Sequence, residues 1–135
     1  MKKLILFISL IFLSIFSINS QNFSGSWGYN IEGKYITLYG DEIENQNNGG
    51  RSGTLKVAIY ATSYPYDGGY LNGYLLYEFT LDPLDAGYYY SDISRRGWCT
   101  YPPSGSYSLT ILLLEYISYD YQIVDYVTMN GYTYF

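Results

Sequence analysis

The sequence predicts an all-β protein, an antiparallel two-sheet sandwich of about seven strands that follows an N-terminal signal peptide. Short segments of alternating apolar and polar residues recur after residue 20, and clusters of Gly, Pro, Asn, Asp and Ser separate them. Ala, Leu, Glu and Lys are too sparse there to build an amphipathic helix. A strand spacing of roughly 10 to 15 residues favours an immunoglobulin-like sandwich over a barrel or a parallel sheet.

Residues 1–20 have the layout of a secretory signal peptide. Lys2 and Lys3 precede a run of Leu, Ile and Phe, and the segment closes on small or polar residues, so cleavage is expected before Gln21. An uncleaved anchor is the alternative, because the apolar run of about 15 residues is only a little shorter than a membrane span. The only cysteine, Cys99, lies too far away for a lipoprotein anchor. The expected location is therefore secreted, extracellular or at the cell surface, with the periplasm as the alternative.

The sandwich domain is expected at residues 34–135, after a lead-in segment at residues 21–33. That segment is rich in Gly, Ser and Asn, which suits a loose lead-in or an edge strand. Weak strand patterns follow at 34–40 and 41–45. The clearest alternation is in GTLKVAIYAT, residues 53–62, where every second residue is apolar on one face. Further strands are expected at 74–81, 87–94, 106–116 and 121–129.

The segment 106–116 contains an unbroken apolar run, ILLL, which is far too short to span a membrane. A continuous apolar run of this length predicts a central strand that is covered on both faces. Pro103 and Gly105 form a rigid turn before it. Tyr107 stands at the start of the strand, where sandwiches of this class place a tyrosine whose hydroxyl bonds to nearby backbone, and ligand contact is the alternative role.

The charge balance argues against some classes of partner. Without Lys2 and Lys3 the seven basic residues fall to five, against twelve acidic ones. Because phosphate binding depends on Lys and Arg, no nucleic acid or anionic membrane partner is expected. A single cysteine cannot form an internal disulfide, so Cys99 is expected to be a small buried residue near a strand end, with a cross-link to another chain as the alternative.

The sequence has no histidine, which removes the usual general base and most zinc sites. Cys99 therefore has no obvious activating base. No catalytic residue and no enzyme activity are expected. The alternative of another class is a small secreted hydrolase that uses paired carboxylates, drawn from Glu78, Glu115, Asp120 and Asp125.

A calcium ion is the only cofactor that the sequence brings into question. Oxygen donors gather in DEIEN and the following QNN, and a hard cation prefers such ligands. The candidate ligands are Asp41, Glu42, Glu44 and Asn45. The spacing matches no EF-hand loop, and a polar edge strand with Glu42 and Glu44 outward around Ile43 explains the run without a metal.

Twenty tyrosines are more than one sheet corner needs. Tyrosine offers a large contact area at low entropic cost and stacks on sugar rings while its hydroxyl stays wet. Tyrosines also favour strands and stabilise sheets through cross-strand pairs, so each can be purely structural. The candidate ligand-binding residues are Tyr64, Tyr66 and Tyr70 in one loop and Tyr88, Tyr89 and Tyr90 at a strand start.

The segments at 52–87, 91–94, 99–107 and 109–129 together resemble small bacterial extracellular immunoglobulin-like modules, similar to cell-adhesion-related (CARDB-like) domains. Such modules occur alone or appended to secreted proteases and other exported proteins. The resemblance rests on a leading strand, a Pro-Gly turn and a tyrosine-bearing strand, so it implies a fold and carries no catalytic residue. RRGWC, residues 95–99, departs from the plain polar and β-branched strand expected there.

The function expected from these observations is that of a secreted, non-enzymatic interaction or adhesion module that binds an extracellular protein or glycan through tyrosine-rich loops. A carbohydrate-binding accessory protein, with or without structural calcium, is the first alternative, and the carboxylate hydrolase is the second.

Overall fold

The computed structural model describes residues 21–135 and shows an all-β sandwich, which confirms the fold class predicted from the sequence. The predicted signal peptide lies outside the described residues. Within residues 21–135 the structure has no helix, and so none that is long and apolar enough to cross a membrane. The strands are β1 (Gln21–Glu32), β2 (Tyr35–Asn45), β3 (Leu55–Thr62), β4 (Tyr74–Leu81), β5 (Tyr89–Trp98), β6 (Ser106–Ile117), β7 (Asp120–Thr128) and β8 (Thr133–Tyr134).

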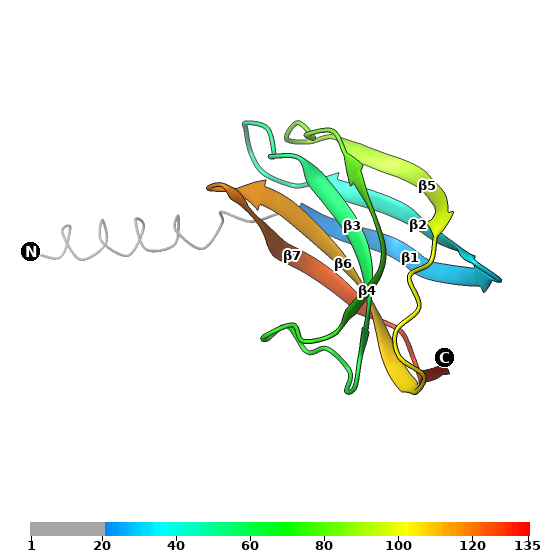
Figure 1. Cartoon of the computed structure of the whole chain (residues 1–135). Coiled ribbons are helices and arrows are strands. Elements are labelled where there is room, and N and C mark those ends of the chain that lie inside the picture. Colours follow the sequence, from blue (N-terminus) through cyan, green and yellow to red (C-terminus); the bar gives the residue numbers. More distant parts are fainter. Residues whose placement is uncertain (1–20) are drawn as a thin grey trace, which may run out of the picture.

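The strands form two antiparallel sheets that pack face to face (Figure 1). One sheet has the order β1-β2-β5, and the other has the order β4-β3-β6-β7, with the short β8 also pairing with β6. The pairs β2-β5, β3-β6 and β6-β7 are those of immunoglobulin-like sandwiches, with the fourth strand joined to the third. The loops that follow β1, β3, β5 and β7 therefore lie at one end of the sandwich, and those that follow β2, β4 and β6 lie at the other.

Two sequence-based boundaries change. Of the two alternatives for the segment at 21–33, the structure confirms the edge strand, because residues 21–32 form β1 and pair with β2. Within the described residues the sandwich therefore includes Gln21–Glu32, and the predicted domain start at residue 34 is wrong. The two weak patterns at 34–40 and 41–45 are one strand, β2, and it is central in its sheet, so DEIEN is not on an edge strand.

A bulge explains why β2 looked like two strands. Ile36 and Leu38 face the core, and so does Ile43, although simple alternation from Leu38 would turn Ile43 outward. The inward phase changes near Asp41, which stands opposite the β1 bulge between Ser24 and Trp27. The Asp41 carboxylate accepts a hydrogen bond from the Ser26 N–H at 2.8 Å. Because the inward phase changes at the bulge, one long strand contains two short amphipathic patterns.

The core lies between the facing sheets. Alternate residues of β3 and β6 supply its centre, including Leu55, Val57 and Ile59 on the first strand. From the other sheet, Trp27 lies against the backbone of Gly40, its partner on β2, at a place where a side chain on Gly40 would overlap the indole ring. Cys99 is also buried, directly after β5, and burial raises the pKa of its thiol above the ordinary value.

Strand β6 is buried on both faces, as its unbroken apolar run predicted. Leu109, Ile111 and Leu113 face the other sheet, whereas Thr110 and Leu112 face outward and are nevertheless fully buried. The loop at 63–73 returns over this outer face, where the Thr128 hydroxyl donates to the Tyr66 carbonyl oxygen at 2.9 Å. The larger sheet thus has a second, smaller packed layer on its outside.

Tyr107 occupies the corner between the 99–105 loop and β6. Its ring is buried, and its hydroxyl donates to the carbonyl oxygen of Pro103 at 2.8 Å, the contact expected of a corner tyrosine. Gly105 exchanges two backbone hydrogen bonds with Phe135, so the turn is also tied to the C-terminal segment.

Side chains close one edge of the sandwich. The Asp125 carboxylate on β7 accepts a hydrogen bond from the Phe23 N–H on β1 at 2.8 Å. Further along the same edge, the hydroxyls of Tyr29 and Thr133 lie 2.8 Å apart and share a hydrogen bond. These cross-sheet contacts hold β1 in place and occupy a backbone donor that an edge strand would otherwise present to other chains.

Candidate functional site

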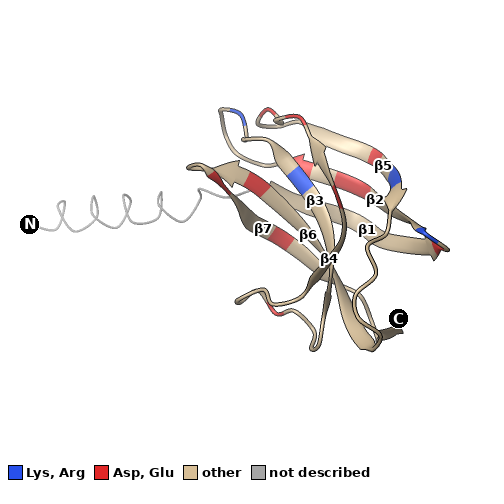
Figure 2. Ribbon diagram, in the orientation of Figure 1, with Lys and Arg blue, Asp and Glu red and all other residues tan. Residues whose placement is uncertain are grey.

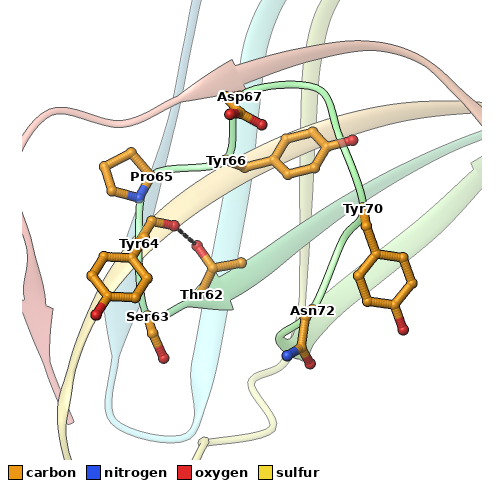
Figure 3. Close-up of a pocket in the computed structure, with 8 residues that line it drawn as sticks. All are labelled: Thr62, Ser63, Tyr64, Pro65, Tyr66, Asp67, Tyr70 and Asn72. Carbon is orange, nitrogen blue, oxygen red and sulfur yellow. Dashed lines mark hydrogen bonds between the residues drawn. The ribbon is translucent and has the colours of Figure 1, made fainter.

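Three of the predicted tyrosines line a surface hollow at the loop between β3 and β4, at residues 63–73. This loop surrounds a hollow of about 340 Å³. Figure 3 shows Tyr64 and Tyr70 on opposite sides of it, with Thr62, Ser63 and Asn72 between them. The lining residues are Thr62, Ser63, Tyr64, Pro65, Tyr66, Asp67, Tyr70 and Asn72.

Internal hydrogen bonds hold the loop in shape. The Thr62 hydroxyl donates to the Tyr64 carbonyl oxygen at 2.6 Å (Figure 3), and the Asp67 carboxylate accepts from the Gly69 N–H at 3.2 Å. Gly68 has a φ of +100°, a conformation that residues with side chains rarely adopt. The loop is therefore organised before any ligand arrives, which lowers the entropic cost of binding.

Tyr66 supports the loop and is not part of its exposed surface. Its side chain is buried, its ring packs edge-on against Tyr126 with centroids 5.0 Å apart, and its hydroxyl donates to the Gly69 carbonyl oxygen at 2.8 Å. Burial, with smaller effects from Tyr126 and Asp67, raises the pKa of Tyr66 above the ordinary tyrosine value. The hydroxyl thus remains a protonated donor, and Tyr64 and Tyr70 are left as the free aromatic side chains.

These two tyrosines are 80% and 93% exposed, respectively. Around them stand hydroxyl, amide and carboxylate groups, with Asp67 as the single charged residue of the lining. Two solvent-exposed aromatic rings beside polar hydrogen-bonding groups suit a ligand with flat apolar faces and many hydroxyls. No Lys or Arg lines the hollow, so it is suited to a neutral ligand and not to an anion.

The structure does not bring the six predicted tyrosines together. Tyr88, Tyr89 and Tyr90 follow β4, whereas the loop at 63–73 precedes it, so the two groups lie at opposite ends of that strand. Tyr88 and Tyr89 are exposed, but Tyr90 is half-buried and its hydroxyl donates to the Asp82 carbonyl oxygen at 2.8 Å.

The predicted calcium ligands do not form one ligand set. Asn45 is buried and its side-chain amide donates to the Leu84 carbonyl oxygen at 2.7 Å, whereas Glu42 and Glu44 point to the outer face of the sheet. Across residues 21–135, nowhere do three or more Asp, Glu or Cys side chains gather as a metal site would require.

The acidic side chains on this face nevertheless affect one another. Burial, a side-chain hydrogen bond with Glu44 and the charges of Glu44, Asp41 and Asp92 raise the pKa of Glu42. Because this folded-state pKa lies above the unfolded one, ionised Glu42 opposes folding. The opposition is absent at low pH and develops as the pH rises through the folded-state pKa.

The Glu42→Gln variant is therefore expected to melt at a higher temperature than the parent protein at about pH 7, and at the same temperature at about pH 3. Thermal unfolding followed by circular dichroism at the two pH values measures the difference. Glu32→Gln is the matched control, because Asn30 and Tyr35, its neighbours on the sheet, carry no negative charge. A gain for Glu42→Gln that persists at low pH would contradict the charge explanation.

The four carboxylates of the hydrolase alternative have separate structural partners. Glu78 pairs with Lys56 at 3.6 Å, Glu115 is buried and accepts from the Gly53 N–H at 3.0 Å, and Asp125 bonds to Phe23. Asp120 accepts from the Tyr121 N–H in the β6–β7 turn.

A second group of exposed aromatic residues was missed at the sequence level. Tyr35 and Trp98 are paired across β2 and β5 on the outer face of the smaller sheet, with ring centroids 5.0 Å apart. The signals that could have found them were the alternation in YITLY, residues 35–39, and the unusual RRGW run at 95–98, which is the exposed end of the edge strand β5.

Searches against protein-family models, curated proteins and solved structures found no match to this chain.

Proposed function

We propose that this protein is a secreted, non-enzymatic binding module that holds a neutral glycan at the loop between β3 and β4. The observation that carries the proposal is the pair of exposed rings, Tyr64 and Tyr70, on either side of a hollow lined by polar groups. Aromatic faces bind the apolar faces of sugar rings, and the hydroxyl, amide and carboxylate groups between them bind sugar hydroxyls.

Two further features support a binding role. The loop is fixed by Tyr66 and by its own hydrogen bonds, so the exposed rings are presented on a rigid base. Among residues 21–135 the carboxylates of the hydrolase alternative are each engaged by a different partner, and the sequence has no histidine to act as a base. The signal-peptide layout of residues 1–20 supports export, where glycans of cell surfaces and matrices are the available ligands.

A screen of the protein lacking residues 1–20 against an array of neutral glycans tests the proposal. The parent protein is expected to bind, and the double variant Tyr64→Ala, Tyr70→Ala is expected to bind its best ligand at least tenfold more weakly, an estimate of about 1.4 kcal/mol for two lost aromatic faces. Both side chains are mostly solvent-exposed, so the variant should keep its melting temperature.

The matched control is the double variant Tyr88→Ala, Tyr89→Ala, which removes two exposed tyrosines from the other end of β4. It is expected to bind as the parent protein does. Loss of binding in this control with retention in the loop variant would move the site to the other end of the sandwich. Failure of the folded parent protein to bind any glycan would remove the glycan proposal and leave a protein ligand as the alternative.

A further inference from the structure

The outer face of the smaller sheet carries an aromatic and basic surface that lies on the opposite face of the sandwich from the loop at 63–73. We call it the aromatic–basic face and define it as Lys34, Tyr35, Tyr39, Arg96 and Trp98. Tyr35 and Tyr39 are the first and fifth residues of β2 and both face outward, and Arg96 and Trp98 lie beside them on β5. All five side chains are exposed.

Each of the two cations of this face lies near an aromatic ring of the same face. The Arg96 guanidinium carbon lies 4.7 Å from the Tyr35 ring centre, and the Lys34 ammonium lies 5.9 Å from the Trp98 ring centre. Trp98 is 63% exposed, which is unusual for so large an apolar side chain. Tyr39 extends the surface along β2, roughly 13 Å from Tyr35 at about 3.3 Å for each strand residue.

The cations of this face have no acidic partner. Within residues 21–135, ion pairs are formed by Arg51 with Asp85 and by Lys56 with Glu78, so two of the five basic residues are neutralised by the protein itself. Lys34, Arg95 and Arg96 make no such pair in the described part of the chain. Residues 21–135 contain twelve acidic and five basic residues, and the unpaired positive charge among them is concentrated at one end of one sheet (Figure 2).

The other half of the same sheet face is acidic. Beyond the bulge, Glu42 and Glu44 point outward on β2, with Asp41 and Asp92 at the bulge itself. An anion that meets this face is therefore attracted to the end with Trp98 and repelled from the end with Glu44. Glu32, on β1 beside Tyr35, is the one acidic residue at the basic end, and it accepts a hydrogen bond from the Asn30 amide at 2.7 Å.

We propose that the aromatic–basic face binds an anionic polysaccharide, a chain of sugar rings that carries carboxylate or sulfate groups. The sugar rings would lie on the Tyr35 and Trp98 rings, with the anionic groups on Arg96 and Lys34. A ring pair at one point of the sheet face and a further ring along the strand suit an extended chain and not a compact ligand. The guanidinium fork of Arg96 matches a carboxylate or a sulfate in shape and charge.

Charge favours such a polymer over a nucleic acid. A duplex presents one phosphate charge for about every 1.7 Å of its length, so binding it takes many cations along the contact. This face offers two of them, beside an acidic half that would oppose a longer phosphate backbone. A polysaccharide with fewer charges and more ring surface fits the observed ratio of aromatic to basic side chains.

Affinity electrophoresis of the protein without residues 1–20 tests the inference. The gels contain polygalacturonate as a carboxylate polymer, dextran sulfate as a sulfate polymer or dextran as a neutral one. Retardation by one or both anionic polymers is expected to exceed that by dextran, and this excess should weaken as salt is raised. Retardation by polygalacturonate alone would indicate a carboxylate ligand, and retardation by dextran sulfate alone would indicate a sulfate ligand.

Arg96→Gln and Trp98→Ala are each expected to weaken binding to the retained polymer about tenfold, because each removes one of the two proposed kinds of contact. Trp98→Tyr keeps an aromatic ring and should retain most of the affinity. The matched control is Arg51→Gln, which removes one equal charge at the other end of the sandwich and should leave binding unchanged. The double variant Tyr64→Ala, Tyr70→Ala should also bind as the parent does, which separates this site from the proposed function.

Three results would overturn the inference. Equal weakening by Arg51→Gln and Arg96→Gln would show unspecific attraction to total charge. Retention of full affinity by Trp98→Ala in a folded protein would show that the rings make no contact. Tighter binding of a single-stranded oligonucleotide than of either anionic polymer, lost on Arg96→Gln, would replace the polysaccharide with a nucleic acid ligand.

Discussion

Gly40→Ala is expected to lower the free energy of unfolding by about 3 kcal/mol, because the new methyl group has no room. Gly40 is paired with Trp27 across β1 and β2, and a β-carbon on Gly40 would overlap the indole ring that lies against it. The ring cannot retreat, since Trp27 is buried among the core residues between the sheets. Urea unfolding gives the free energy, and the melting temperature should fall by roughly 10 °C.

Gly49→Ala is the control, because a β-carbon on Gly49 would have no neighbour within 4 Å. It should change stability by less than about 0.5 kcal/mol. The double variant Gly40→Ala, Trp27→Phe should be more stable than the sum of the two single changes predicts, since the smaller ring leaves space for the methyl group. Strict additivity would show that the cost does not arise from overlap between these two residues.

Tyr107→Ala is expected to lower the free energy of unfolding by about 3 to 4 kcal/mol, and Tyr107→Phe is expected to lower it by about 1 kcal/mol. The larger loss reflects a buried ring that also contacts Tyr74 and Phe135, with centroids 5.9 and 6.1 Å away. The smaller one isolates the hydroxyl, which donates to the Pro103 carbonyl oxygen at 2.8 Å. Urea unfolding of both variants measures the two contributions separately.

Tyr101→Phe provides the comparison for the hydroxyl. Tyr101 makes a similar hydrogen bond to the Gly33 carbonyl oxygen at 2.6 Å, but its ring is 52% exposed and water can replace the contact. Loss of the Tyr101 hydroxyl should therefore lower the free energy of unfolding by less than loss of the Tyr107 hydroxyl does. If the two phenylalanine variants unfold at the same urea concentration, the corner hydrogen bond has no special weight in this sandwich.

The parts of the fold that the sequence could predict are those set by local pattern. The alternation of residues 53–62 and the apolar run at 111–114 are properties of single segments, and they gave β3 and β6 correctly. The lead-in at 21–33 was partly misassigned because its Gly, Ser and Asn content disfavours a strand. What makes it one is pairing with β2 and the contact of Phe23 with Asp125, which is distant in sequence.

For the candidate sites too, local sequence pattern predicts some features, whereas others depend on contacts between distant segments. The exposure of Tyr64 and Tyr70 could be anticipated from a loop composition, but the burial of Tyr66 depends on the return of that loop over the outer face of β6 and β7. Tyr35 and Trp98 are far apart in sequence, and only the pairing of β2 with β5 brings their rings together. Such juxtapositions depend on sheet order, which no single segment encodes.

The loop at 63–73 divides its tyrosines between two tasks, and this division constrains how the protein can diverge. Tyr66 is tied to the packed layer outside β6, so a change there would disturb folding, whereas Tyr64 and Tyr70 touch mainly solvent. Substitutions at residues 64 and 70 should therefore leave the fold unchanged, whereas residue 66 has to remain aromatic. The ligand proposed for this loop could thus be changed by substitutions at two positions, without a compensating change elsewhere in the chain.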